Sequence, residues 1–199
     1  MKIFALSDIH GDKHLAKELA EKAAQENVDL VVFAGDLAEE ETGSVEGLIG
    51  PFKEKSLDVA IMPGNHDNMA TMNFLIEHYK IKNLHGYVIK KGDIGIFGCG
   101  YANVGPNFLD EDSVWKTLQH GHNQIKDFKK KIMITHTHPS ESKLGLGVFP
   151  GSEAIQLALE QFKPDFHLCG HIHETHGIEE VIGKTKVINV GRKGKIIEL

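Results

Sequence analysis

The chain has 199 residues, of which 41% are hydrophobic and 25% are charged, and its formal net charge is −6. These values are typical of one soluble globular domain, which we expect to span residues 1–199. The negative net charge argues against a protein dedicated to binding long nucleic acids. Arg192 is the one arginine among 22 basic residues, so bidentate arginine clamps on phosphate are almost unavailable.

Two features of the sequence indicate a cytoplasmic protein. Cys99 and Cys169 both lie in apolar, strand-like runs, which favours buried free thiols in a reducing compartment. The apolar run at the N-terminus is too short for a signal peptide, and no stretch approaches the length of a membrane span. We therefore expect no membrane partner.

Strand-like apolar runs alternate with helical patterns along the chain. Strands are predicted at Lys2–Leu6, 30–33, Val59–Met62, on both sides of a turn at 91–93, at 132–135, at Phe166–Cys169 and as short pieces over 180–199. Helices are predicted from an Asp12 N-cap to about Glu26, then at 45–54, Met69–Tyr79, 110–128 and 152–162. This order predicts an α/β domain with a mixed sheet. Residues 145–152 form a Gly/Pro loop that we interpret as a flap near a site.

Polar residues follow five of the predicted strands directly. They are Asp8 and His10, then Asp36, then Asn65, His66 and Asp67, then His136 and His138, and finally His171 and His173. Sites in open α/β sheets lie at the carboxyl ends of strands, so these side chains are expected to converge in one crevice. Any one of these residues alone is better explained as a turn former, a helix cap or a structural histidine. Five such groups in the same position relative to a strand favour a shared metal site.

The donors in these groups are two carboxylates, one amide and several imidazoles. Asp8, Asp36, Asn65, His10, His136, His171 and His173 make seven, which is too many for one tetrahedral ion and suits two ions bridged by one carboxylate. Nitrogen and oxygen ligands without thiolate favour Mn, Fe, Co, Ni or Zn over Mg or Ca.

The series Asp8-x-His10, Gly35-Asp36, Gly64-Asn65-His66-Asp67, His136 and Gly170-His171-x-His173 resembles the signature of the calcineurin-like metallophosphoesterases in order and content. The resemblance implies a four-layer α-β-β-α sandwich with two mixed sheets. It also implies that Asp8, His10 and His173 hold one ion, that Asn65, His136 and His171 hold the other, and that Asp36 bridges them. His66 would face the substrate as the catalytic residue and donate a proton to the leaving group. The implied cofactors are two divalent ions, with Mn favoured.

The sequence departs from the family pattern after Asp36. Glu39 stands where some members have an Asp that orients the equivalent of His66, so Glu39, Glu40 or neither could fill that role. The Arg that follows in protein phosphatases is missing, which favours a phosphodiester or small-molecule substrate. His138 is predicted to support the metal ligands or to face the substrate, and Asp67 to support them or to cap the helix that follows.

Other histidines are interpreted as outside the site. His120 and His122 are predicted to be exposed helix residues, and His14, His78, His85, His167 and His176 are predicted to be structural or surface residues, with His176 the nearest to the motif.

Two alternatives remain beside the phosphoesterase. One is a scaffold with this fold and little catalysis, which predicts a lost ligand; the other is a nuclease, which predicts a basic groove. The residues at 126–131 form the one dense basic cluster. We expect a small phosphorylated substrate recognised by loops at 101–112 and 140–152, with nucleic acid bound only as a small or cyclic nucleotide. This interpretation is compatible with a homodimer.

Overall fold

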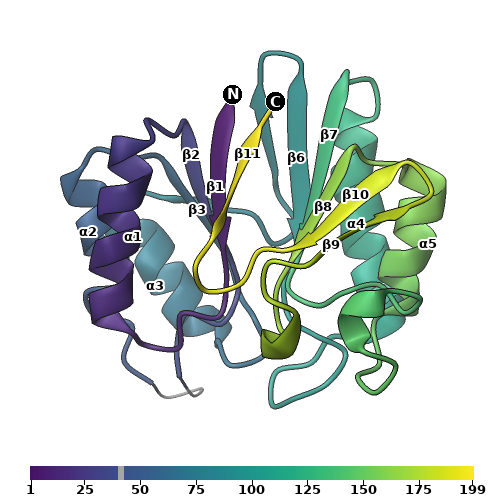
Figure 1. Cartoon of the computed structure of the whole chain (residues 1–199), viewed down its shortest axis with the longest axis horizontal. Helices are drawn as coiled ribbons and strands as arrows, with labels where there is room; N and C mark the ends of the chain where they lie inside the picture. Colours follow the sequence, from purple (N-terminus) through teal and green to yellow (C-terminus); the bar gives the residue numbers. More distant parts are fainter. Residues whose placement is uncertain (40–42) are drawn as a thin grey trace.

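The computed structural model describes residues 1–39 and 43–199, and it contains two β-sheets packed face to face with helices on both outer sides (Figure 1). The first sheet has the order β11-β1-β2-β3-β4, in which β1 to β4 are parallel and β11 is antiparallel to β1. Its strands are β1 (Lys2–Leu6), β2 (Leu30–Ala34), β3 (Val59–Met62), β4 (Lys82–Asn83) and β11 (Lys195–Glu198).

The second sheet has the order β5-β6-β7-β8-β10-β9. Its central strands β6, β7, β8 and β10 are parallel, and the edge strands β5 and β9 are antiparallel to their neighbours. The strands are β5 (Val88–Lys91), β6 (Ile94–Cys99), β7 (Lys130–Thr135), β8 (Phe166–Cys169), β9 (Glu179–Ile182) and β10 (Thr185–Asn189). Both sheets are therefore mixed, as predicted.

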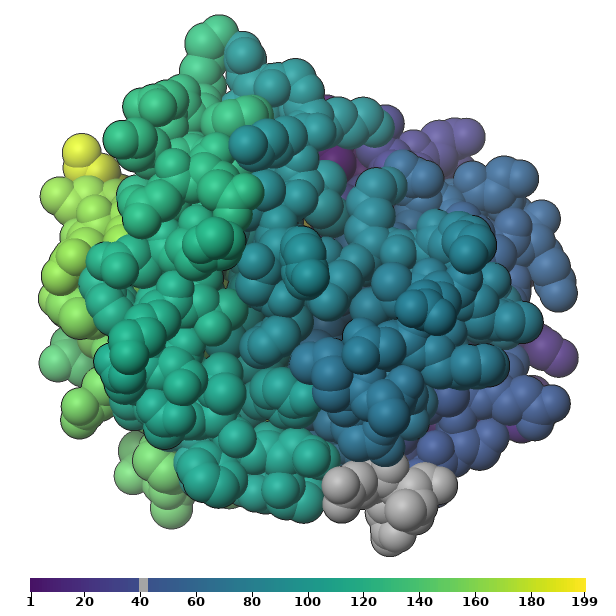
Figure 2. Space-filling view, turned by 180° about the vertical axis from the view of Figure 1, so that it is seen from behind, coloured from purple at the N-terminus to yellow at the C-terminus, as the bar shows by residue number. Residues whose placement is uncertain are grey.

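Helices cover the outer face of each sheet. The first sheet carries α1 (Lys13–Gln25), α2 (Gly50–Glu54) and α3 (Met69–Tyr79), and the second carries α4 (Glu111–Ile125) and α5 (Glu153–Phe162) (Figure 1). Two short 3₁₀ turns, η1 (Lys143–Gly145) and η2 (His173–Thr175), lie in loops. Seen from behind, the segments between α3 and α4 cover the junction of the two halves (Figure 2).

The core explains why the inner strands are apolar on both faces. In β1, Ile3 and Ala5 pack between the sheets, whereas Phe4 and Leu6 pack under the helices of the first sheet. Because side chains alternate along a strand, a strand buried on both faces reads as a continuous apolar run. The four-layer α-β-β-α sandwich is confirmed.

Side-chain caps define where four of the helices begin. Asp12, Asn68, Asp110 and Ser152 each accept a hydrogen bond from the backbone N–H three residues on. The cap of α3 is thus Asn68, and the interpretation of Asp67 as that cap is wrong.

The structure differs from the prediction in several details. The helix predicted at 45–54 begins only at Gly50, because the residues before it form turns. The two-residue strand β4 is too short to leave a pattern in the sequence. His120 is exposed, as predicted, but His122 is half-buried and stacks on Phe162 with ring centroids 4.2 Å apart.

The two ends of the chain lie side by side, since β11 returns to pair with β1 and the Met1 amino group donates to the carbonyl of Leu199 (Figure 1). None of the helices in the described ranges has the length and apolar character needed to cross a bilayer.

Candidate metal centre

The predicted ligands follow β1, β2, β3, β7 and β8, whose carboxyl ends meet at the lower edge in Figure 1. Four of these ligands, Asp8, His10, Asp36 and His171, have positive φ angles of 57°, 47°, 53° and 72°. This backbone conformation is unfavourable for residues with a side chain and is concentrated at functional sites. The chain therefore accepts local strain in order to aim these side chains at one point.

Asp8, His10 and His173 form one half of the cluster. The Nε2 atoms of His10 and His173 lie 3.2 Å apart, and His173 Nε2 lies 3.7 Å from Asp8 Oδ1. Asp8 is fully buried, and its Oδ2 accepts a hydrogen bond of 2.5 Å from the Ser7 hydroxyl. Three donor atoms, from the loop after β1 and from the loop after β8, thus lie close together.

Asn65, His136 and His171 form the other half. His136 Nε2 lies 3.1 Å from Asn65 Oδ1, and the rings of His136 and His171 meet edge to face at 5.1 Å. His136 Nδ1 donates to the carbonyl of Ala34 at 2.8 Å. Because Nδ1 carries the proton that the Ala34 carbonyl accepts, Nε2 keeps a free lone pair for a metal. The orientation of His136 therefore fits a bound ion.

Asp36 lies between the two halves. Its Oδ2 is 3.2 Å from His136 Nε2 and 3.7 Å from His10 Nε2, and its Oδ1 accepts from the backbone N–H of His66 at 2.9 Å. The Asp36 carboxylate can occupy this place between the two halves because residue 64 is a glycine. A side chain at Gly64 would collide with the carboxylate. Two triads of donor atoms, one of Asp36, His136 and His171 and one of Asp8, His10 and Asp36, each lie within 4.8 Å.

The electrostatics of the cluster favour a cation. Burial alone would raise the pKa of the Asp8 carboxyl, but His173, His176 and the charge of His136 outweigh it and hold this pKa well below its ordinary value. Burial likewise would lower the pKa of His136, but the carboxylates of Asp36 and Asp8 raise it to about 9. The carboxylates thus stay ionised and attract positive charge, whether from a proton or from a metal ion.

Two of the other imidazoles, those of His171 and His10, are kept neutral and ready to coordinate, whereas the Asp8 carboxylate raises the pKa of His173. Burial, followed by the charge of His136, lowers the pKa of His171 to about 4. Burial also lowers the pKa of His10. A neutral imidazole is the form that binds a metal, so these shifts suit a ligand role.

His66 lies beside the cluster and lines the cleft above it. Its ring meets that of His10 edge to face at 5.3 Å, and the side chain is half-buried. The structure places no carboxylate of the described residues in hydrogen-bond contact with this ring. Glu39 is exposed and makes no such contact, and Glu40 lies outside the described residues.

Asp67 supports the backbone under the cluster. Its buried carboxylate accepts from the N–H groups of Leu37, Ala38 and Gly64. These bonds tie the loop that carries Asp36 to the loop that carries Asn65. Burial outweighs them and raises the pKa of the Asp67 carboxyl.

His138 packs against the loop at 145–152. It is buried, Gly145 packs against its ring, and its Nε2 lies 3.3 Å from the carbonyl of Phe149. His138 therefore anchors the loop at 145–152.

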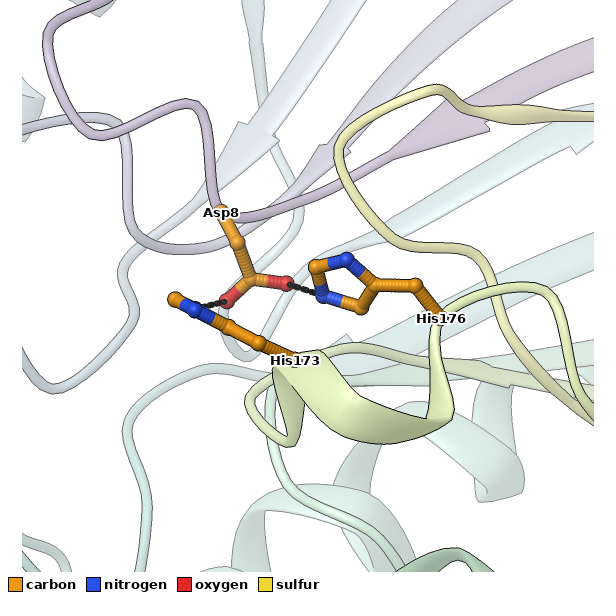
Figure 3. A group of neighbouring side chains, drawn as sticks. All are labelled: Asp8, His173 and His176. Atoms are coloured by element: carbon orange, nitrogen blue, oxygen red, sulfur yellow. Dashed lines mark ion pairs between the residues drawn. The ribbon is translucent and has the colours of Figure 1, made fainter.

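His176 is the residue that the sequence did not single out. Its Nε2 lies 3.3 Å from Asp8 Oδ2, on the side of the carboxylate opposite His173 (Figure 3). The 3₁₀ turn η2 explains the position, because residues three apart in such a turn lie on the same side. The spacing His173-x-x-His176 was the available signal. Asp8, His173 and His176 make a third triad within 4.8 Å.

The remaining histidines lie elsewhere in the described residues. His14 and His78 are exposed, His85 Nδ1 accepts from the N–H of Gly100 at 3.0 Å, and His167 is fully buried beside Thr135. These four positions agree with the structural or surface roles predicted for them.

A cleft of about 390 Å³ opens over the cluster. Its lining consists of His10, Asp36, His66, Val104, Phe149, His171, Ile172, His173 and Glu174. A larger hollow of about 580 Å³ lies between α3 and β5, but none of the predicted ligands lines it. The chemistry rather than the size of the cavity identifies the site.

The fold and the cluster together define the class of binuclear-metal phosphoester hydrolases. The model of the Calcineurin-like phosphoesterase family matches residues 1–175, and the chain belongs to that family.

The chain is similar to several named proteins over most of its length. The uncharacterized protein MJ1162 of Methanocaldococcus jannaschii is 28% identical over 99% of this chain and 91% of its own length. A probable glycerophosphodiester phosphodiesterase of Arcobacter nitrofigilis is 30% identical over 73% of this chain and 56% of its own length. The crystal structure of TT1561 of Thermus thermophilus superposes with a TM-score of 0.77 at 19% identity, covering 96% of this chain and 90% of that one, which shows the shared fold.

Proposed function

We propose that the chain is a phosphoesterase that uses two divalent ions to hydrolyse a phosphodiester or another small phosphorylated compound. The observation that carries this proposal is the position of Asp36. Its Oδ2 lies within 3.7 Å of His10 Nε2 and within 3.2 Å of His136 Nε2, and these imidazoles belong to different halves of the cluster. One carboxylate in this position can serve two ions.

The donor set supports the assignment of the ligands. Asp8, His10 and His173 would hold one ion, Asn65, His136 and His171 would hold the other, and Asp36 would be shared. Nitrogen and oxygen donors suit first-row ions, and we propose Mn²⁺ ahead of Fe, Co, Ni or Zn. When bound, the two ions supply an activated water and neutralise charge on the phosphoryl oxygens.

His66 is the proposed catalytic acid. It lines the cleft, its backbone is fixed by the hydrogen bond to Asp36, and its ring is not needed to complete either ligand group. An imidazolium in this position can stabilise the charge that develops on the leaving oxygen and can protonate it.

The charge of the cleft favours a diester over a monoester. A phosphodiester carries one negative charge, whereas a monoester can carry two. Neither Lys nor Arg occurs among the described residues that line the cleft, and Glu174 adds a carboxylate to its wall. Beyond the imidazolium proposed for His66, the second negative charge of a monoester would therefore meet no cationic side chain in this lining. The similarity to a probable glycerophosphodiester phosphodiesterase points the same way.

The position of the basic cluster at 126–131 argues against a nuclease. Lys129 and Lys130 pair with Asp93 and Asp165 at 2.6 Å and 2.8 Å. These lysines lie at or before the start of β7, whereas His136 follows its end. The cluster is thus at the opposite edge of the sheet from the cleft, where it cannot guide a nucleic acid to the metal ligands.

We also propose a cytoplasmic location, on the ground that Cys99 and Cys169 are both buried and free. Burial raises the pKa of the Cys99 thiol to about 12, which keeps it protonated and inert.

The proposed function is tested by comparing kcat/KM for bis(4-nitrophenyl) phosphate, 4-nitrophenyl phosphate and a 2′,3′-cyclic nucleotide, each with Mn²⁺. We expect the diester to be preferred over the monoester by about tenfold or more, equal to about 1.4 kcal/mol of transition-state stabilisation. Asp36→Asn, purified in parallel, controls for a contaminating hydrolase. A preference for the monoester would refute the diester assignment, and the absence of hydrolysis of all three would refute the phosphoesterase.

A further inference from the structure

Two loops form the walls of the cleft above the metal ligands. One loop, residues 100–110, joins β6 to α4 and contributes Val104. The other, residues 136–152, joins β7 to α5 and contributes Phe149. Ile172, between His171 and His173, also borders the cleft, but it is only 4% exposed, so Val104 and Phe149 supply the apolar surface. Any substrate whose phosphate is held at the cluster must extend past these side chains.

Apolar side chains are unusually exposed on these two loops. Val104 and Phe149 are 41% and 43% exposed. These loops carry half of the large hydrophobic residues that are exposed in the described part of the chain. Besides Val104 and Phe149, they are Phe108, Leu146 and Val148. Apolar residues gathered beside a site indicate a surface that is covered when a ligand binds.

Hydrogen bonds hold both walls in place relative to the ligands. Asn107 donates through its backbone N–H and through Nδ2 to the carbonyl of Asn65, at 3.3 Å and 3.1 Å. Asn103 Nδ2 donates to the carbonyl of Gly151 at 2.9 Å, which joins the two loops. His138 bonds the carbonyl of Phe149. Val104 and Phe149 are therefore part of a built wall rather than of a free loop tip.

The wall offers little to a charged or strongly polar group. Residues 102–109 contain no ionisable side chain. Apart from the predicted ligands and His66, the described lining of the cleft contains one ionisable group, the carboxylate of Glu174. This combination disfavours a second phosphate and favours a neutral, apolar group.

We propose that the wall formed by Val104 and Phe149 binds an apolar, ring-bearing ester arm of the substrate. The substrate class is thus a phosphodiester with one aromatic or nucleobase-like arm, rather than one with two polar arms such as glycerol. This inference rests on the proposed function, because it takes the phosphate to lie at the metal ligands.

The test uses two phosphinates that carry one negative charge and have no ester bond to hydrolyse, dimethylphosphinate and methyl(phenyl)phosphinate. Their affinities for the Mn²⁺-loaded protein are measured by calorimetry, so turnover is not required. We expect the phenyl compound to bind about tenfold more tightly, equal to about 1.4 kcal/mol, because a ring covered by the wall loses apolar surface to water.

Variants separate the wall from the metal ligands. Phe149→Ala should reduce the preference for the phenyl compound to about threefold or less and leave the affinity for dimethylphosphinate unchanged within about twofold. Phe149→Leu should retain part of the preference. Phe74→Ala, which removes a 60% exposed phenylalanine from α3 outside the cleft, is the matched control and should change neither affinity.

The outcomes distinguish this inference from the proposed function. Equal binding of the two phosphinates to the wild type, or an undiminished preference in Phe149→Ala, would refute the apolar wall alone. If neither phosphinate bound the Mn²⁺-loaded protein, the phosphate site itself would be refuted, and the wall with it.

Discussion

Replacing His176 tests a feature of the site that the structure revealed and the sequence did not. His176 Nε2 is buried and lies 3.3 Å from Asp8 Oδ2, and it has no hydrogen-bond partner among the described residues. We interpret His176 as a positioning residue that holds one oxygen of Asp8 and directs the other toward the ion shared with His10 and His173. His176→Phe removes this contact and keeps a ring of similar shape beside Gly191.

The magnitude follows from the charge and burial of Asp8. His176 contacts a fully buried carboxylate, and loss of a partner that orients a ligand lowers metal affinity by about 10–100-fold. We therefore expect His176→Phe to weaken one of the two ions by about 10–100-fold and to leave the other within about twofold. His176→Gln, whose amide N–H can reach Asp8, should restore most of the affinity.

The assay is competition between the protein and a fluorescent chelator for Mn²⁺, fitted to two separate dissociation constants. His120→Phe is the matched control, since His120 is exposed on α4 and lies outside the cluster. Wild-type affinity at both sites in His176→Phe, or an equal loss at both, would refute the positioning role.

Three further predictions concern other residues. Asp36→Asn should lower the affinity for both ions, measured as bound metal per chain, because its carboxylate lies between the two halves; loss of a single ion would contradict the bridge. His66→Ala should reduce kcat on a diester by about 10²-fold or more while two ions still bind, and a fall in metal content would show that His66 is a ligand. The third prediction is a pH dependence. Burial lowers the pKa of His167 to about 3, so below pH 6.5 the unfolded chain binds a proton that the folded chain does not, and stability falls as the pH falls. Between pH 7 and pH 5 the metal-free protein should lose about 2 kcal/mol of unfolding free energy from this residue. Urea titrations of the wild type and of His167→Gln, which keeps a donor for Thr135, should differ by that amount, and parallel pH profiles would contradict it.

The sequence predicted the ligand cluster because it depends on local rules. An apolar strand precedes each of Asp8, Asp36 and His136. Parallel strands bring their carboxyl ends to the same edge of a sheet, independently of the conformation of the loops. The caps Asp12 and Asp110 were also visible, because a cap is defined by its neighbours in sequence.

Other parts of the site depend on contacts between distant segments and leave no local pattern. His176 reaches Asp8 only because η2 turns it and because Gly191 leaves room for its ring. His138 was expected near the metal ligands, but its direction depends on how the loop at 145–152 packs against it. Asp67 was interpreted either as a support for the ligands or as a cap, and the sequence could not decide, because its carboxylate meets backbone N–H groups that lie about 30 residues away in sequence.

The most direct test of the binuclear phosphoesterase is a Mn²⁺ titration of protein that has been stripped with EDTA, with hydrolysis of bis(4-nitrophenyl) phosphate and bound metal measured on the same samples. We expect negligible activity in the stripped protein and full recovery as the bound metal reaches two ions per chain. Hydrolysis that survives complete removal of the metal, or that saturates at one ion per chain, would contradict this expectation.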